Sequence, residues 1–266
     1  GHRPELPLPV GPRAVKIPQR HWDARAALNF MLGGSGAGLI VASIALAPAS
    51  PWPLALGLAL VAAGLAAVWL EIGRKLRALH VFFNPFTSWM TRESFTALLL
   101  FVLGVGSMMT LRFIPAAALA ALAYLWCQAR ILRAARGIPA WRVPEIVPLI
   151  VAAGLAEGAA LALLFSQSLL LLTLFGISVG ARALAWLRYR AVTNNPVLER
   201  TGRNMLQLGT VGALACALAG AYAAPFAWLA ALAALATGWQ MKFLLVTRAS
   251  AYEGLRLPHL PVRGTR

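Results

Sequence analysis

One short stretch of the sequence gathers most of its chemically versatile side chains. It contains Glu71, Arg74, Arg77, His80, Asn84, Trp89, Arg92 and Glu93. An imidazole beside carboxylates and guanidinium groups offers hydrogen-bond partners for the two oxygens of a quinol, and a titratable group for its protons. The alternative is an interfacial belt, in which Trp lies at headgroup level and Arg pairs with lipid phosphates. Both interpretations place this stretch at a membrane surface.

A further carboxylate, Glu157, lies deep inside an apolar run. A carboxylate there costs about 2.5 kcal/mol or more unless it is neutral or paired, so it must face a bundle interior or a water-filled cavity. Arg182 is offset from it by about 12 Å along the helix axis, at 1.5 Å per residue, so direct pairing is not expected. We predict that Arg182 snorkels to the surface. Glu157 is then either a proton-relay residue or a protonated structural hydrogen-bond donor.

The remaining reactive residues exclude several kinds of site. The histidines are His2, His21, His80 and His259, and all lie outside the apolar runs. A membrane haem usually takes His ligands from within its helices, so no haem is expected in this chain. Asp23 is the only aspartate, which disfavours a serine-hydrolase triad. Cys127 and Cys216 stand singly in apolar runs and suggest neither a disulfide framework nor a metal site.

The composition indicates a membrane protein. Of the 266 residues, 60% are hydrophobic and 12% are charged, far more hydrocarbon than one soluble core requires. A spanning helix needs about 20 mostly apolar residues. Such runs extend from Ala24 to Ala47, Pro53 to Leu70, Phe95 to Leu111, Ile114 to Leu132, Pro144 to Phe165, Ser168 to Leu187, Met205 to Ala224 and Phe226 to Val246. We predict an all-α fold, a polytopic membrane bundle of eight transmembrane helices.

The cations give this bundle an orientation. The net charge is +16, but Lys and Arg gather where apolar runs end rather than on a soluble domain, so nucleic-acid binding is not expected. Alternate connections are short and uncharged, or longer and basic, and only Arg112 falls on the neutral side. The N-terminal arm and the tail, with which Lys242 is counted, join the basic side. The positive-inside rule therefore places both termini in the cytoplasm, in the inner (cytoplasmic) membrane.

Three regions follow from this pattern. Residues 1–21 hold five prolines among basic residues, a composition that favours an extended cytoplasmic arm. Residues 22–247 form the eight-helix domain, and residues 248–266 form a cytoplasmic tail. Because the opposite face has only short turns, the cytoplasmic face is where a soluble protein can dock.

The first apolar run contains Asn29 and the glycine-rich segment 33–38. No strand precedes it, so a phosphate-binding loop is not indicated. Small residues at Gly34 and Gly38 would let a neighbouring helix backbone approach closely, and a ligand-lining role is the less favoured alternative.

The sequence Ser88-Trp89-Met90-Thr91-Arg92-Glu93 resembles the signature of the membrane-anchor subunits of dimethyl-sulfoxide-reductase-type molybdoenzymes. With Asn84 and Pro85 before it, this version is most similar to anchors of phenylacetyl-CoA:acceptor oxidoreductases, and next to those of sulfite dehydrogenases. The resemblance implies an eight-helix anchor that holds no redox cofactor of its own. It also implies an iron–sulfur subunit and a molybdopterin catalytic subunit as partners, and electron exchange with membrane quinone.

This resemblance and the polar stretch together predict a site for menaquinone or ubiquinone. Family anchors use a histidine near this loop, and His80 is the candidate here. The predicted quinone-binding residues are His80, Arg77, Glu71, Arg92, Trp89 and Asn29. The predicted proton-transfer residues are Glu93 and Glu157. The predicted docking residues for the iron–sulfur partner are Arg74, Lys75, Asn84, Arg136 and Arg203.

Two other functions stay open. A small secondary transporter would place substrate groups near the bilayer midplane, and Glu157 and the glycines of the first run are its support. A purely structural anchor would bind the same partners but exchange no electrons with quinone.

Overall fold

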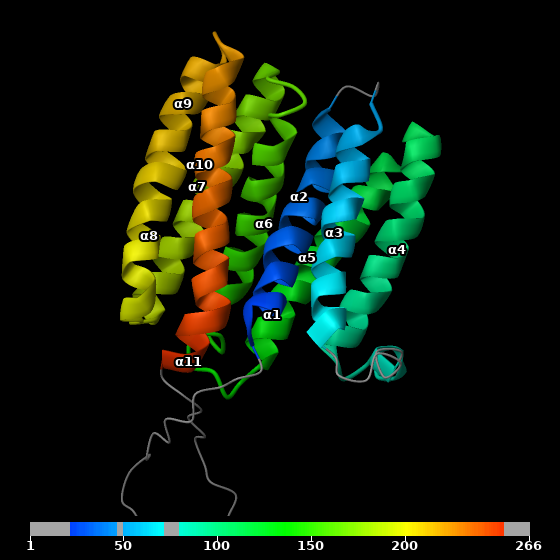
Figure 1. The fold of residues 1–266 in the computed structure, drawn as a ribbon, viewed down its shortest axis with the longest axis vertical. Helices are drawn as coiled ribbons and strands as arrows, with labels where there is room; N and C mark the ends of the chain where they lie inside the picture. The colour runs from blue at the N-terminus through cyan, green and yellow to red at the C-terminus, as the bar shows by residue number, and fades with distance from the viewer. Residues whose placement is uncertain (1–21, 47–49, 72–79, 253–266) are drawn as a thin grey trace, which may run out of the picture.

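The protein folds into a bundle of helices that run along one common direction (Figure 1). A computed structural model describes residues 22–46, 50–71 and 80–252, and those residues form helices and no strand. The predicted arm 1–21, most of the tail, and Arg74, Lys75 and Arg77 lie outside the described residues. The predicted all-α class is confirmed for the part that is described.

We call a continuous run of helical segments a rod. The first half of the chain forms four such rods (Figure 1). The first rod is continuous through α1 (Ala24–Leu28), a π-helical segment (Asn29–Gly33), α2 (Gly34–Ala42) and a 3-10 turn (Ser43–Ala45). It is followed by α3 (Trp52–Glu71), α4 (Trp89–Met109), a 3-10 turn (Leu111–Phe113) and α5 (Ile114–Ala134).

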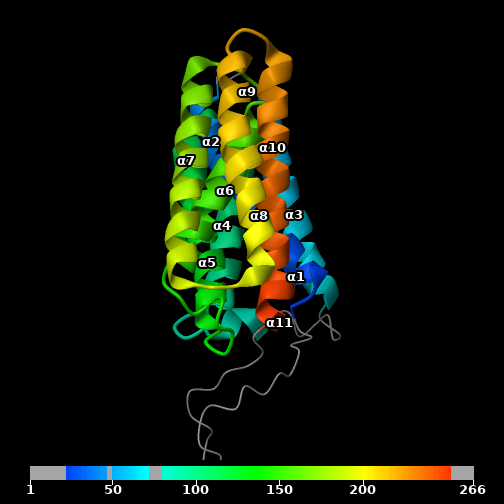
Figure 2. The same ribbon diagram turned by 90° about the vertical axis from the view of Figure 1, so that its left-hand side faces the viewer.

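The second half packs on the other side of α2, as the two perpendicular views show (Figure 2). It contains α6 (Ile146–Ala162), α7 (Leu169–Val192) and a 3-10 turn (Pro196–Leu198). The next rod is α8 (Glu199–Leu206), a π-helical segment (Gln207–Gly212) and α9 (Ala213–Gly220). The last rod is α10 (Ala224–Leu244), a π-helical segment (Leu245–Ala249) and α11 (Ser250–Tyr252). The final helix therefore continues past the predicted domain boundary at residue 247.

Helices α2 and α6 form the centre of the bundle, and glycine lets them touch. A Cβ atom on Gly38 would lie 1.9 Å from the carbonyl oxygen of Gly154, and a Cβ atom on Gly158 would lie 1.9 Å from the carbonyl carbon of Gly38. Only residues without a side chain allow this approach. The predicted packing role of Gly38 is confirmed.

Among the described residues, six helices are long and apolar enough to cross a membrane. They are Ala24–Ala45, Trp52–Leu70, Trp89–Met109, Leu111–Ala134, Leu169–Val192 and Ala224–Ala249. Of the two other predicted spans, α6 is a shorter apolar helix, and the rod of α8 and α9 starts with charged residues. The count of eight transmembrane helices therefore stays a prediction. The six apolar helices fit a multi-pass membrane protein.

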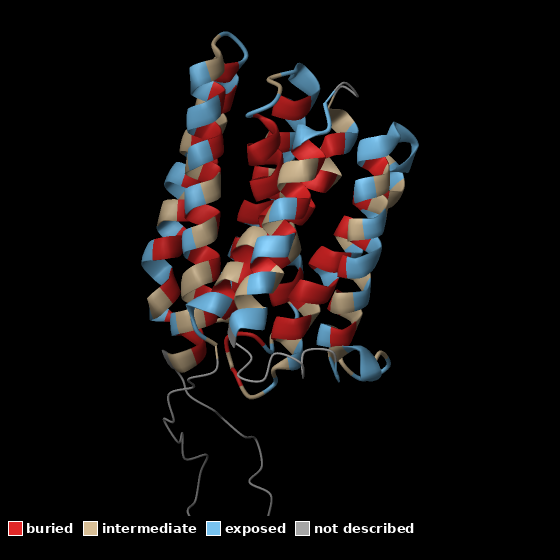
Figure 3. Ribbon diagram, turned by 45° about the vertical axis from the view of Figure 1, so that its right-hand side comes forward, coloured by how far each residue is buried: buried red, intermediate tan, exposed pale blue. Residues whose placement is uncertain are grey.

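The outer surface of the bundle is apolar, as lipid contact requires. Buried residues lie on the inward helix faces and exposed ones on the outward faces (Figure 3). On α4, for example, Leu98, Val102 and Val105 are each more than half exposed. Helices α1 and α11, the first and last of the described chain, lie at the same end of the bundle (Figure 1).

Candidate functional site

The motif Ser88 to Glu93 lies on the first turns of α4 rather than in a connection. The Ser88 side chain accepts a hydrogen bond from the backbone N–H of Thr91, 3.3 Å away, which is the contact of an N-cap residue. Helix α4 consequently begins at Trp89, earlier than the predicted start at Phe95. The apolar run begins only at Phe95, because the first turn of α4 is polar and does not belong to it.

Two motif side chains bond to the segment that precedes the helix. The Arg92 guanidinium donates to the carbonyl oxygens of Pro85 (2.8 Å) and Phe86 (2.6 Å). The Thr91 hydroxyl donates to the carbonyl oxygen of Val81. Arg92 also lies 4.2 Å from the centre of the Trp89 ring, a cation–π distance. The motif therefore builds a polar edge, held by hydrogen bonds, at the end of the bundle.

Arg130, which the sequence did not single out, extends this edge to α5. Its guanidinium carbon lies 4.5 Å from the Trp89 ring centre and 5.9 Å from that of Trp126. Trp126 in turn lines an open groove of about 450 Å³ between α5, α6 and α7. The groove is mostly apolar, with Arg133 among its lining residues. A lipid-soluble molecule could enter there.

Glu93 turns inward and forms a buried cluster with Asn29, Tyr124 and Gln128, here called the Glu93 cluster. The Asn29 amide donates to the Glu93 carboxylate at 3.1 Å, and the Tyr124 hydroxyl donates to the Asn29 side-chain oxygen at 3.2 Å. The Gln128 amide nitrogen lies 3.0 Å from the backbone oxygen of Asn29 and 3.2 Å from the Tyr124 hydroxyl. The structure thus joins two predicted site residues, Asn29 and Glu93, that are 64 positions apart.

Glu157 has a cationic partner that the sequence did not reveal. The Lys242 ammonium donates to Glu157 Oε2 at 2.7 Å and to the backbone oxygen of Phe30 at 3.0 Å. Ser35 donates to the same carboxylate oxygen at 2.7 Å, and Trp239 donates to Ser35 at 2.8 Å. Both charged side chains are fully buried. Counting Lys242 with the exposed tail was wrong, because it lies on the inward face of α10.

The prediction that Arg182 snorkels was also wrong. Its side chain is fully buried and donates to the backbone oxygens of Ala234 (2.6 Å) and Gly209 (2.7 Å). Gly238 leaves room between it and Glu157, since a Cβ atom there would lie 2.7 Å from Glu157 Oε1 and 2.9 Å from Arg182 Nη1. No ion pair joins Glu157 and Arg182 within the described chain, but the two side chains lie much closer together than the predicted axial offset implies.

Two adjacent glycines separate the Glu93 cluster from the Lys242–Glu157 pair. A Cβ atom on Gly33 would lie 2.7 Å from the Tyr124 hydroxyl, and one on Gly34 would lie 2.6 Å from the Lys242 ammonium. Buried polar groups therefore follow one another across the bundle interior from α4 to α7. In hydrocarbon such groups are costly, and they mark functional pathways more often than structure alone.

Three π-helical segments border these groups. Asn29 begins the first, Gly209 lies in the second, and the third starts at Leu245, close behind Lys242. π-helical turns inside α-helices are frequent at functional sites.

The chain has no match among known protein-family models, and no curated protein matches it. The motif and the geometry around it are therefore the grounds for any functional assignment.

The other predicted site residues are not drawn into the buried clusters. His80 is exposed and contacts the ring of Phe83 edge-on, with 5.4 Å between centroids. Asn84, Arg136 and Arg203 are exposed. Glu71 ends α3, but its side chain lies outside the described part. Within the described residues, no group of three or more His, Cys, Asp or Glu is placed to hold a metal ion.

Sequence reasoning missed Tyr124, Gln128 and Lys242, although a signal was present for each. Tyr124 and Gln128 are four residues apart in an apolar run and therefore share a helix face. Lys242 lies inside the last run, at a depth where a cation needs an anionic partner.

Proposed function

We propose that this chain is the quinone-interacting membrane-anchor subunit of a molybdopterin and iron–sulfur oxidoreductase complex. The observation that carries the proposal is the geometry of the motif. The polar side chains from Ser88 to Glu93 contribute to one polar edge, and this edge ends in the buried carboxylate of Glu93. Eight spans, cytoplasmic termini and an inner-membrane location belong to the same proposal.

The chemistry of this edge suits a quinol. Oxidation of a quinol releases two electrons and two protons. An iron–sulfur cluster in the docked partner would take the electrons, and the protons need acceptors in this chain. Glu93 is a carboxylate at the inner end of the edge, and His80 is an exposed imidazole at the outer end. Gln128 Oε1 is buried and has no hydrogen-bond donor in the described part of the chain, so it is a free acceptor. The apolar groove beside Trp126 suits an isoprenoid tail.

The partner would dock at the end of the bundle where α4 begins and α5 ends. Asn84 precedes α4, Arg136 follows α5, and Arg203 lies on α8, which starts at this same end (Figures 1 and 2). These exposed groups can contact an acidic or polar protein surface without burial of charge in lipid.

Replacing Glu93 with Gln tests the site. The amide keeps the contact with Asn29 but takes up no proton, so quinone-coupled turnover of the intact complex should fall about 10²-fold or more. Turnover with an artificial dye should stay unchanged, because it bypasses the anchor. His80→Ala should likewise lower quinone-coupled turnover and leave dye turnover unchanged.

Glu145→Gln is the matched control, since Glu145 precedes α6 and its side chain caps no backbone N–H. Unchanged quinone-coupled turnover in Glu93→Gln would remove Glu93 from the site. An equal loss with dye and quinone would mean that the variant disrupts assembly instead.

A secondary transporter is the second candidate, and the Lys242–Glu157 pair favours it. A transporter needs charged groups inside the bundle and interrupted helices, and here a buried ion pair lies among helices interrupted by π-helical segments. Co-purification separates the two candidates, because a transporter would carry neither iron nor molybdenum with it.

A further inference from the structure

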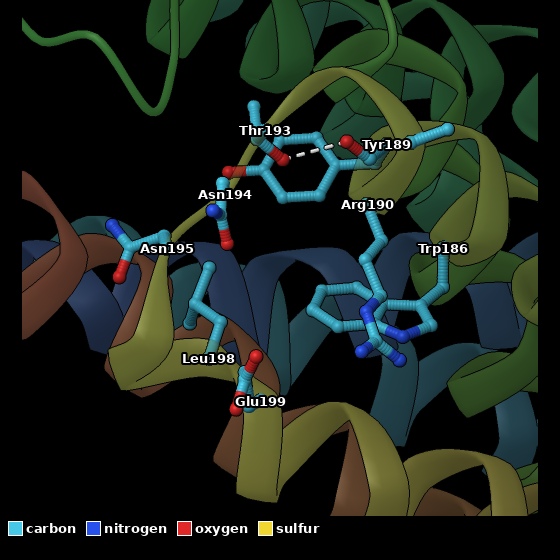
Figure 4. Close-up of a pocket in the computed structure, with 9 residues that line it drawn as sticks. Trp186, Tyr189, Arg190, Thr193, Asn194, Asn195, Leu198 and Glu199 are labelled. Carbon is cyan, nitrogen blue, oxygen red and sulfur yellow. Dashed lines mark hydrogen bonds between the residues drawn. The ribbon is translucent and has the colours of Figure 1, made fainter.

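A separate polar pocket of about 280 Å³ lies where α7 ends and α8 begins. Figure 4 shows Tyr189 and Thr193 on one side of it, and Leu198 and Glu199 on the opposite side. Trp186, Arg190 and Asn195 also line it. None of these residues belongs to the Glu93 cluster or to the Lys242–Glu157 pair.

Two donors in this pocket lack acceptors. Trp186 is 2% exposed and Asn195 7% exposed, yet Trp186 Nε1 and Asn195 Nδ2 have no hydrogen-bond partner within the described chain. The Asn195 oxygen accepts from the backbone N–H of Val197 at 3.1 Å, and its nitrogen points away from Trp186 and Arg190 (Figure 4). Trp186 is therefore the buried donor that a ligand lying between Arg190 and Glu199 can reach. Unpaired buried donors are costly, so a ligand that brings acceptor oxygens would be stabilised there.

The charges of the pocket have both signs. Arg190 and Glu199 are both exposed, and no ion pair joins them among the residues that the structure describes. A cation and an anion that stay apart across one pocket match a ligand with an anionic and a cationic group.

The surroundings are apolar on the lipid side. Leu184 and Leu187 are each about half exposed on α7. Ala191, which lines the pocket, follows them at helical spacing on the same face. An apolar stripe therefore leads along the outer surface of α7 to the polar pocket, the arrangement that a phospholipid requires.

We propose that this pocket binds a phosphoethanolamine group, in which Trp186 and Arg190 donate to the phosphate oxygens and Glu199 accepts from the ammonium. The apolar stripe favours the headgroup of phosphatidylethanolamine as the source of that group. Free phosphoethanolamine offers the same chemistry and is the other source to be tested.

Native mass spectrometry of the full chain, delipidated in detergent and titrated with lipid, tests this site. Phosphatidylethanolamine should bind about tenfold more tightly than phosphatidylglycerol, which lacks the ammonium, as one charge-assisted hydrogen bond implies. Glu199→Gln should abolish this preference. Trp186→Phe should weaken both lipids by about tenfold, whereas Arg188→Gln, an exposed neighbour on α7 outside the pocket, should change neither.

Glu199 is exposed, so its replacement by Gln tests the site even if Trp186→Phe does not fold. Free phosphoethanolamine that binds as tightly as the lipid, with the same dependence on Glu199, would keep the site and assign it a soluble ligand. Equal affinity for the two lipids, or a preference that survives in Glu199→Gln, would overturn the proposal.

Discussion

Replacing Lys242 with Met should destabilise the bundle by about 3 to 5 kcal/mol, because it leaves the Glu157 carboxylate buried without its cation. Lys242 also donates to the backbone oxygen of Phe30, so the substitution removes a contact between α10 and the first rod. Denaturant or thermal unfolding in detergent measures the loss. Arg248→Met, an exposed cation in the same rod, is the matched control and should shift stability by about 0.5 kcal/mol or less.

A second replacement on the opposite side of the pair separates charge from packing. In the double variant Lys242→Met with Glu157→Leu, neither charge of the pair remains, so part of the lost stability should return. The return should be incomplete, because the buried guanidinium of Arg182 then loses the nearby carboxylate. A double variant that loses as much free energy of unfolding as the two single variants lose together would mean that the ion pair is not the origin of the effect. The double variant would also show whether the pair is needed for function, since a proton relay through Glu157 would stop.

Replacing Gly158 with Ala should be one of the most damaging single methyl additions among the described residues. The new Cβ atom would lie 1.9 Å from the carbonyl carbon of Gly38 and 2.2 Å from the backbone nitrogen of Leu39. Backbone atoms cannot rotate away, so α2 and α6 must separate, at a cost of about 3 kcal/mol or more. The yield of monodisperse protein and its melting temperature in detergent measure this loss.

Gly180→Ala is the control, because a Cβ atom on Gly180 meets nothing within 4 Å. Alanine has the better helix propensity, so this variant should be equal to the original or more stable by up to about 1 kcal/mol. Equal melting temperatures for Gly158→Ala and Gly180→Ala would contradict the close contact of α2 with α6.

The sequence predicted helices well because their cause is local. An apolar run that must lie in lipid has to satisfy its own backbone hydrogen bonds, so it becomes a helix wherever it packs. The N-cap of α4 was equally local, and Ser88 could have indicated it. The polar turn that follows Ser88 lowers the hydropathy, which is why the predicted start fell at Phe95.

The partners of buried charges depend on how helices rotate against each other, and the sequence does not carry that information directly. Glu157 and Lys242 are 85 positions apart, and only the packing of α6 beside α10 makes them neighbours. Arg182 illustrates the same limit. Its depth alone suggested snorkelling, but its helix face points inward, where backbone oxygens of two other rods accept its hydrogen bonds.

The Glu93 cluster was predictable in part. Asn29 was predicted to bind quinone and Glu93 to transfer protons, and the structure places their side chains in contact. The same geometry places the centre of the candidate site on the buried face of α4 rather than in the exposed segment before it. His80, which the resemblance favoured, lies at the surface instead.

The most direct measurement is the metal content of the chain after mild detergent extraction from its native membrane. A quinone-interacting anchor should elute with an iron–sulfur protein and a molybdenum-containing subunit, and added quinol should reduce the iron–sulfur clusters of that complex. A chain that elutes alone, without iron or molybdenum, under conditions that preserve other membrane complexes of the same cells, would contradict the proposed function.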